Sequence, residues 1–185
     1  MKMKGVLGRQ EERDSRLDFN LTGSFDPQLL STTHSRYCVM INTLIWNIRG
    51  VSKAPNLRRL INLLRLHGVQ FLAISEPKID VSRVEYIRMR LSFDYAIVNI
   101  SEDLWIFYSA PFNCSLVGNS IQHISLSIQH PWLPGPMIFS FVHAMCSVEG
   151  HCDLWQNLLS DKPRSLPWCI GGDFNVIVDA HEKRG

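Results

Sequence analysis

Residues 39–75 read VMINTLIWNIRGVSKAPNLRRLINLLRLHGVQFLAIS, and the prediction of the fold starts here. Val39 to Trp46 is an apolar, β-branched run that predicts a buried strand, and Val69 to Ser75 is a second apolar run. Between them, leucine and isoleucine recur at the i, i+3, i+4 and i+7 spacing of a helix, which is expected to begin at Pro55 and to end at Gly68. Because strand, crossover helix and strand form a βαβ unit, the two strands are predicted to be parallel.

The rest of the chain predicts further short strands and two more helices. The spacing Ser82-x-x-Glu85 predicts a capping box at the start of a helix, and another helix is expected near Cys152 to Leu159. Strands are predicted at residues 95–100, 104–109, 113–117, 122–129, 137–144 and 167–170. The strand at 122–129 alternates Ile and Leu with Ser and Gln, so one of its faces is expected to be solvated. The predicted class is α/β with a mixed sheet.

The composition is that of a globular chain with a separate N-terminal segment. The 185 residues are 45% hydrophobic and 19% charged, with a net charge of +2, which excludes a wholly disordered or fibrous protein. Residues 1–38 alternate charges with Ser, Thr and Gly without a period, and they predict a disordered or loosely attached leader. Residues 39–185 are expected to form the domain.

The sequence predicts a nuclear or cytoplasmic protein that is not secreted and has no membrane span. Its apolar runs fall far short of the roughly 18 residues that a span needs, and charged residues follow the N-terminus where a signal peptide would be apolar. Five cysteines without a C-x-x-C pair indicate reduced thiols and not a disulfide framework or a zinc site. A pI near 8.3 favours nucleic-acid binding only weakly.

Polar residues follow three of the predicted strands and suggest a metal site. Asn47 follows the first strand, Glu76 follows the second, and Asp173 with Asn175 follows the last. Ligands of open α/β sheets usually bind beyond the strand ends, and two carboxylates flanked by amides suit Mg²⁺, with Mn²⁺ as an alternative. Such an ion polarises phosphoryl oxygens in phosphodiester cleavage. Taken singly, Asn47 is also a common turn former and Glu76 a common solvated loop acid.

Three motifs in order carry a family resemblance: Trp46-Asn-Ile-Arg-Gly50, Glu76-Pro-Lys78 and Gly171-Gly-Asp-Phe-Asn175. Together they resemble the endonuclease/exonuclease/phosphatase superfamily, from Met40 to the end of the chain. The short sequences at Trp105, Trp155 and Trp168 look more narrowly like the endonuclease regions of plant LINE-type retrotransposon polyproteins. The resemblance implies a mixed-sheet, DNase I-like four-layer α/β sandwich and Mg²⁺-dependent hydrolysis of phosphodiester bonds in nucleic acid, DNA more than RNA.

The resemblance also implies a role for each motif residue. Glu76 matches the principal Mg²⁺ ligand, and Asn47 matches the asparagine that orients this acid and the phosphate. Asp173 matches the acid that positions or activates the attacking water, and Asn175 the amide that holds the scissile phosphate. His143 ends a predicted strand where the family usually has a tyrosine that contacts the phosphate. It is an expected phosphate contact or, equally, a histidine with a structural role.

The sequence departs from the family pattern at its C-terminus. The family has a later Ser-Asp-His-like motif, whereas this sequence has no Asp-His dipeptide, and Asp179 and His181 are the nearest substitutes. The sandwich is therefore expected to be incomplete and to self-associate through an exposed sheet face or edge. Two alternative functions follow, namely a catalytically inactive remnant that acts as a binding or interaction module, and a phosphomonoesterase of the same superfamily.

Two further groups of residues, three arginines and four tryptophans, are expected to have structural roles. Arg58, Arg59 and Arg65 lie on the polar face of the first predicted helix, which indicates a solvated face and, as the alternative, contacts with a nucleic-acid backbone. The tryptophans at 46, 105, 155 and 168 lie within apolar patterns and are expected in the core.

Overall fold

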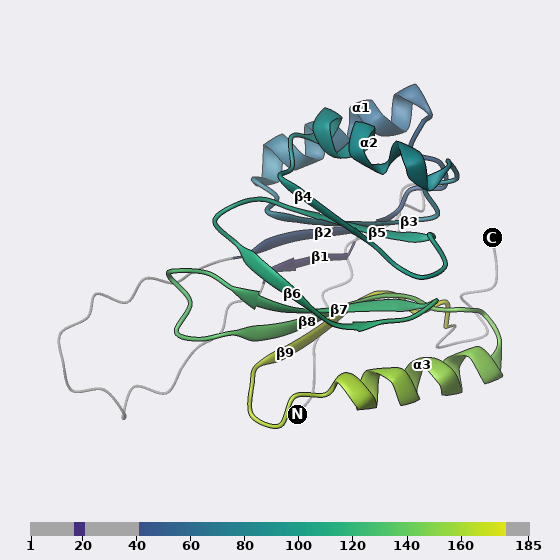
Figure 1. The fold of residues 1–185 in the computed structure, drawn as a ribbon. Coiled ribbons are helices and arrows are strands. Elements are labelled where there is room, and N and C mark those ends of the chain that lie inside the picture. The colour runs from purple at the N-terminus through teal and green to yellow at the C-terminus, as the bar shows by residue number, and fades with distance from the viewer. Residues whose placement is uncertain (1–16, 21–40, 177–185) are drawn as a thin grey trace, which may run out of the picture.

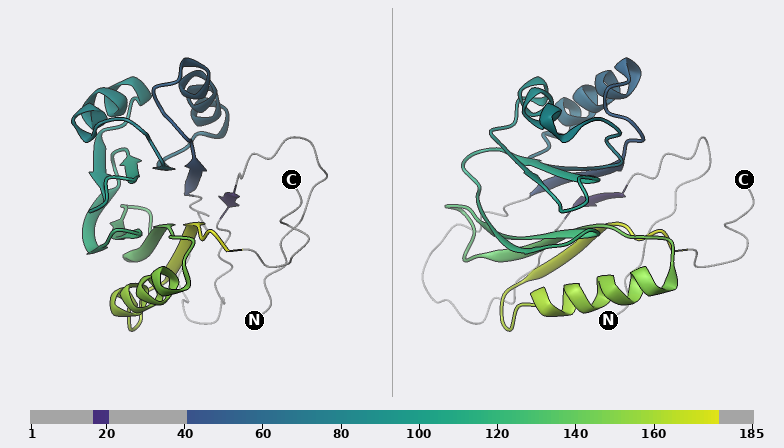
Figure 2. Two further views of the ribbon diagram at one scale, coloured as in Figure 1. Left: turned by 90° about the vertical axis from the view of Figure 1, so that its right-hand side faces the viewer. Right: turned by 45° about the vertical axis from the view of Figure 1, so that its right-hand side comes forward.

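Two β-sheets pack face to face, and helices cover the outer face of each sheet (Figure 1). The structure is a computed structural model that describes residues 17–20 and 41–176. The layers follow one another as helix, sheet, sheet, helix (Figure 2). The four-layer α/β sandwich expected from the family resemblance is therefore the observed fold.

The first sheet has five strands in the order β1-β2-β3-β5-β4. Their bounds are β1 (Leu17–Asn20), β2 (Asn42–Asn47), β3 (Phe71–Ser75), β4 (Tyr95–Val98) and β5 (Leu104–Tyr108). β2 and β3 are parallel, with Thr43 opposite Phe71, and the other pairs are antiparallel. The predicted βαβ unit is confirmed. β1 lies within the segment predicted as a leader, and the rest of that segment lies outside the described residues.

The second sheet has four strands in the order β6-β7-β8-β9. Their bounds are β6 (Asn113–Asn119), β7 (His123–Gln129), β8 (Met137–His143) and β9 (Trp168–Asp173). β8 and β9 are parallel and are joined by helix α3 (Val148–Asp161), so this sheet holds a second βαβ unit. Among the described residues β6 and β9 are the edge strands of this sheet, and the predicted self-association through a sheet face or edge stays a prediction.

Helix α1 (Ala54–His67) begins one residue before the predicted start at Pro55 and ends at the predicted stop. Pro55 stands in its first turn, and Gly68 follows its last turn in the left-handed conformation, with φ of 55°. Its apolar stripe packs with that of α2 (Val84–Leu91) against the outer face of the first sheet, through Leu60, Leu63 and Ile87. Among the described residues, no helix is long and apolar enough to cross a membrane.

The main core lies between the two sheets. Alternate residues of β3 and β5, such as Phe71 and Ile106, meet Ile124 and Leu126 of β7 and Phe141 of β8 in one buried cluster. The intervening residues of β2, β3 and β5 face the helices instead. Both faces of the inner strands are thus buried, which explains why these strands read as continuous apolar runs.

Three local predictions were wrong. The predicted capping box does not form, because a short 3₁₀ helix (Val81–Arg83) precedes α2 and the Asp80 side chain accepts from Ser82 N. The predicted solvated face of β7 is partly buried, since Ser125 is fully buried and shares a 2.7 Å hydrogen bond with Ser140 under the α3 layer. Trp155 is not a core residue: it is 48% exposed, and it stacks on Phe174.

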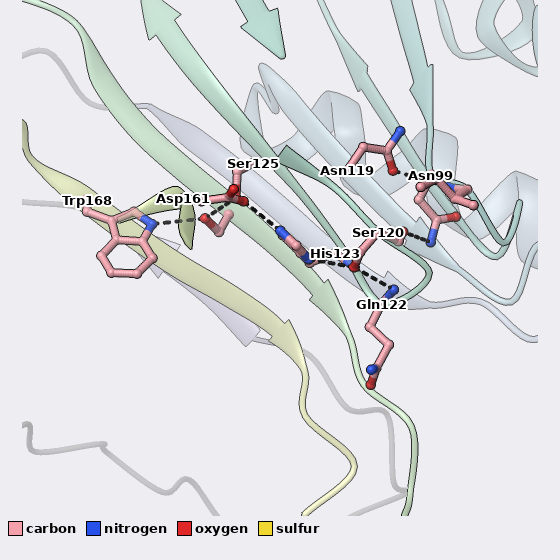
Figure 3. A network of polar contacts seen from close by, with 10 residues as sticks. Asn99, Asn119, Ser120, Gln122, His123, Ser125, Asp161 and Trp168 are labelled. Atoms are coloured by element: carbon pink, nitrogen blue, oxygen red, sulfur yellow. Dashed lines mark hydrogen bonds and ion pairs between the residues drawn. The ribbon is translucent and has the colours of Figure 1, made fainter. Parts of the chain in front are cut away.

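A buried polar network fixes α3 against the second sheet (Figure 3). His123 is 2% exposed, and its Nε2 lies 2.7 Å from Oδ2 of Asp161 at the end of α3. Its Nδ1 lies 2.7 Å from Oγ of Ser120 in the turn between β6 and β7. A side chain at Gly118 would overlap the Asp161 carboxylate, so the glycine makes room for this contact at an irregular point of β6.

The reactivity of the Cys114 and Cys169 thiols reports on the packing of the two sheets. Both pack against the core between the sheets, and burial raises the pKa of Cys114 to about 12 and that of Cys169 above its ordinary value. Because the thiolate is the reactive form, iodoacetamide at neutral pH is expected to modify exposed Cys146 and Cys152 first, and Cys114 and Cys169 only on unfolding. Mass spectrometry of labelled peptides measures this order. Equal labelling rates at all four residues would contradict the packing of the sheets.

Candidate metal-binding site

The ends of β2, β3 and β9 meet at one edge of the sandwich. β2 and β3 end at Asn47 and Ser75, and β9 ends at Asp173 in the other sheet. β2 and β9 are in contact, although more than 120 residues separate their ends. The two βαβ units therefore deliver their last residues to the same place.

Asn47 joins the two acids predicted for the site. Its Nδ2 donates to Oε1 of Glu76 at 2.9 Å and to Oδ2 of Asp173 at 3.2 Å. The two carboxylate oxygens are therefore at most about 6 Å apart. Two negative charges at that distance repel by roughly 3 kcal/mol at an effective dielectric constant near 20, so a positive charge between them is favoured.

The backbone around Glu76 holds its carboxylate at this edge. Glu76 has a φ of 50°, an uncommon conformation for a residue with a side chain. Its N–H donates to Asp103 O, and its carbonyl accepts from Gly50 N at 2.9 Å. The Asn56 side chain in turn donates to Ile48 O and Gly50 O, which ties the loop after β2 to the start of α1.

Glu76 is ionised more readily than an ordinary glutamate. The hydrogen bond from Asn47 is the main cause that lowers its pKa, partial burial opposes it, and Lys78 and His143 lower it further. Lys78 Nζ lies 3.0 Å from Oε2 of Glu76, and its side chain is 58% exposed. One carboxylate oxygen thus faces Asn47, and the other already faces a cation that is free to move into solvent.

Asp173 and Asn175 lie in a tight turn after β9. Asp173 Oδ1 accepts from Asn175 N at 3.0 Å, while the Asn175 side chain donates to Ala144 O at 2.6 Å. A side chain at Gly172 would overlap the Val142 carbonyl, so only glycine lets β9 approach β8 this closely. Asn175 is exposed and has a second amide hydrogen that is free to donate.

His143 ends β8 directly opposite Asp173 in the parallel ladder. It is partly exposed, and it lies near enough to Glu76 that a positive charge on its ring lowers the pKa of that carboxyl. All five predicted site residues therefore lie at this edge of the sandwich. Their assignment to metal, water and phosphate remains a prediction. Asp179 and His181 lie outside the described residues.

The donor set fits a hard divalent cation. The Oδ1 atom of Asn47 is buried and has no hydrogen-bond partner within residues 17–20 and 41–176, and it belongs to the amide that joins the two carboxylates. Mg²⁺ typically uses one or two protein carboxylates and fills its other positions with water and substrate oxygens. No cluster of three or more His, Cys, Asp or Glu side chains occurs in the described ranges, so a site built entirely from such ligands is not seen there.

The sequence reasoning missed the residues that brace this edge. Gln122 is buried, accepts from Met145 N at 2.7 Å and donates to Gly150 O at 2.8 Å, which holds the loop after β8. His151 contacts Phe174 O, and Trp155 stacks on the Phe174 ring. Helical spacing places His151 and Trp155 on α3, but no pattern in the sequence shows that this helix packs beside Phe174.

Comparison with known proteins supports the fold. No protein-family model and no curated protein matches the sequence. Among solved structures, the chain is similar to the human Nocturnin catalytic domain with bound sulfate, at 18% identity and a TM-score of 0.52. It is also similar to two proteins of Bacteroides thetaiotaomicron. One is an endonuclease/exonuclease/phosphatase family protein, at 13% identity and a TM-score of 0.56. The other is a mannosyl-6-phosphatase, at 13% identity and a TM-score of 0.54.

These similarities cover 74% of this chain and 64% to 66% of the other chains. The chain thus spans slightly less than two thirds of the length of the structures it matches. It has the DNase I-like α/β fold of the endonuclease/exonuclease/phosphatase proteins over that part. At identities this low, the similarity establishes the fold, and the retrotransposon origin remains a prediction.

Replacing Asn47 by leucine is expected to raise the pKa of Glu76 toward its ordinary value, because the main contact that stabilises the carboxylate is lost. In the native chain, the stability gained from ionised Glu76 is present above the unfolded pKa and is lost as the pH falls through the lower folded pKa. An NMR titration of the Glu76 carboxyl group measures both variants, with Asn62→Leu as an exposed control. An unchanged pKa in Asn47→Leu would show that the amide does not hold Glu76.

Gly172→Ala is expected to lower the free energy of unfolding by about 1–3 kcal/mol, because the new methyl group overlaps the Val142 carbonyl. Urea unfolding measures the change. Gly135→Ala is the matched control, since a side chain at Gly135 meets open space. Equal stabilities of the two variants would refute the close approach of β8 and β9.

Proposed function

We propose that this protein is a Mg²⁺-dependent phosphodiesterase that cleaves nucleic acid, DNA more than RNA, and that it descends from a retrotransposon endonuclease. The observation that carries the proposal is the meeting of Glu76 and Asp173, from two sheets, on the single amide of Asn47. A nuclear or cytoplasmic location and Mn²⁺ as a substitute metal belong to the same proposal. The fold is compatible with it.

In this proposal Glu76 and Asn47 hold the metal. The ion supplies a Lewis acid that polarises a phosphoryl oxygen and offsets the charge that develops during cleavage. Glu76 brings an ionised carboxylate whose Oε2 becomes available when Lys78 swings toward solvent. Asn47 keeps the two carboxylates close together through its amide, and these residues would hold the ion when it is bound.

The remaining residues act on the water and the phosphate. Asp173 accepts hydrogen bonds from the Asn47 side chain and from the backbone of Asn175, which fix its carboxylate for the role of orienting the attacking water. Asn175 offers its free amide hydrogen to a phosphate oxygen. His143, opposite Asp173 in the ladder, donates a hydrogen bond to the phosphate in place of the tyrosine usual in the family.

Two other functions remain to be separated from this one. A phosphomonoesterase is favoured by one specific observation, the structural similarity to a mannosyl-6-phosphatase. The other alternative is an inactive remnant that serves as a binding or interaction module. Both share the observed fold, so only an activity measurement distinguishes them.

The test measures the rate at which the protein nicks supercoiled plasmid in the presence of Mg²⁺. Glu76→Gln is expected to lower this rate about 10²-fold or more, because the metal loses its ionised ligand. Glu149→Gln, an exposed residue in the first turn of α3, is the matched control and is expected to nick normally. Hydrolysis of p-nitrophenyl phosphate without nicking would support the phosphomonoesterase. No activity from a cooperatively folded chain would support the remnant.

A further inference from the structure

A groove of about 610 Å³ runs between α1 and α2 on the outer side of the first sheet. These two helices lie next to each other over that sheet (Figure 2). The floor of the groove is apolar, formed by Leu57 and Ile61 of α1, by Ile87 of α2 and by Ile79. The proposed metal site uses none of these residues.

The rim of this groove is cationic. Arg58, Arg83 and Arg90 line it, and among the described residues none that line it is acidic. The Arg83 guanidinium lies 4.6 Å from the centre of the Tyr86 ring, and Arg90 Nη1 lies 3.3 Å from the Tyr86 hydroxyl. Tyr86 therefore holds two guanidinium groups in place beside a half-exposed aromatic ring.

The segment of the chain that forms this groove carries an excess of positive charge. Residues 48–91 contain nine Lys and Arg but only three Asp and Glu, a net charge of +6, whereas the whole chain carries +2. The rest of the chain is therefore net negative, at −4. Three of these cations, Arg58, Arg83 and Arg90, line the groove, and a local excess of positive charge favours an anionic partner.

The groove begins at the loops that carry the proposed metal ligands. Ser52 and Ile79 line it, and Ile79 follows Glu76 by three residues, which limits their Cα separation to about 11 Å. The two loops are joined by hydrogen bonds from Gly50 N to Glu76 O and from Val51 N to Pro77 O. Lys78, which is exposed, lies between Glu76 and Ile79 in the sequence and pairs with the Glu76 carboxylate.

We infer that this groove is an extended substrate site that binds a single-stranded segment of the nucleic acid flanking the cleaved bond. The inference rests on the proposed nuclease function. The arginines pair with phosphates, and the apolar floor and Tyr86 accept unpaired bases, which a duplex would keep hidden. An acidic protein segment has similar charge, but it lacks the continuity with the metal site that a substrate strand has.

The test measures binding of a fluorescent single-stranded DNA of about 20 nucleotides by anisotropy, in EDTA, so that cleavage does not interfere. Each phosphate contact on a single strand contributes about 0.7 to the slope of log K against log salt. The double variant Arg83→Gln, Arg90→Gln is expected to reduce that slope by about 1.4 and to weaken binding roughly five- to ten-fold. Arg83→Lys retains the charge and is expected to retain most of the slope.

Arg65→Gln is the matched control, because Arg65 is exposed on α1 and does not line the groove. Equal affinity and slope in this control and in the double variant, with both chains folded by circular dichroism, would overturn the inference. Equal Arg-dependent losses with a duplex of the same length would overturn the single-strand preference. Arg83-dependent binding of poly-L-glutamate that exceeds DNA binding would assign the groove to a protein partner.

The DNA-binding measurement and the plasmid-nicking assay can fail independently of each other. Arg-dependent DNA binding without Glu76-dependent nicking supports the groove as a nucleic-acid site and refutes the nuclease. Glu76-dependent nicking with unaltered DNA binding in the double variant refutes the groove and leaves the nuclease standing.

Discussion

A single amide nitrogen, Nδ2 of Asn47, connects the two halves of this protein. It donates to Glu76 after β3 and to Asp173 at the end of β9, so it joins acids that come from different sheets. The two carboxylates repel each other, and the amide and Lys78 offset part of that repulsion. The site at the edge of the sandwich therefore exists only while the two sheets remain docked.

The docking itself depends on the core between the sheets. Buried residues of β3 and β5 interlock there with those of β7 and β8, and this contact sets the distance between β2 and β9. Each sheet contains one βαβ unit, and both units end at the same edge. Parallel strands joined by a helix place their last residues together, which explains why polar residues from distant parts of the chain meet.

The two helical layers differ in charge and in their relation to the site. α1 and α2 lie in a strongly basic segment that follows the metal-ligand loops, and they leave an arginine-lined groove between them. α3 instead supports the site from the outer side of the second sheet, since its His151 and Trp155 contact Phe174. The end of α3 is fixed by the contact between Asp161 and His123. One layer carries the groove proposed for an anionic partner, and the other braces the turn after β9.

The order of strands and helices, the parallel pairing of β2 with β3 and the stop at Gly68 follow from local patterns that the sequence by itself determines. The motif residues are visible there too, because they stand directly after apolar runs. Only the tertiary structure decided that Ser125 is buried, that Asp80 caps the turn before α2, and that Gln122 and Lys78 support the site. The physical reason is that these outcomes depend on contacts between residues far apart in the chain or on competing local hydrogen bonds, which spacing alone does not reveal.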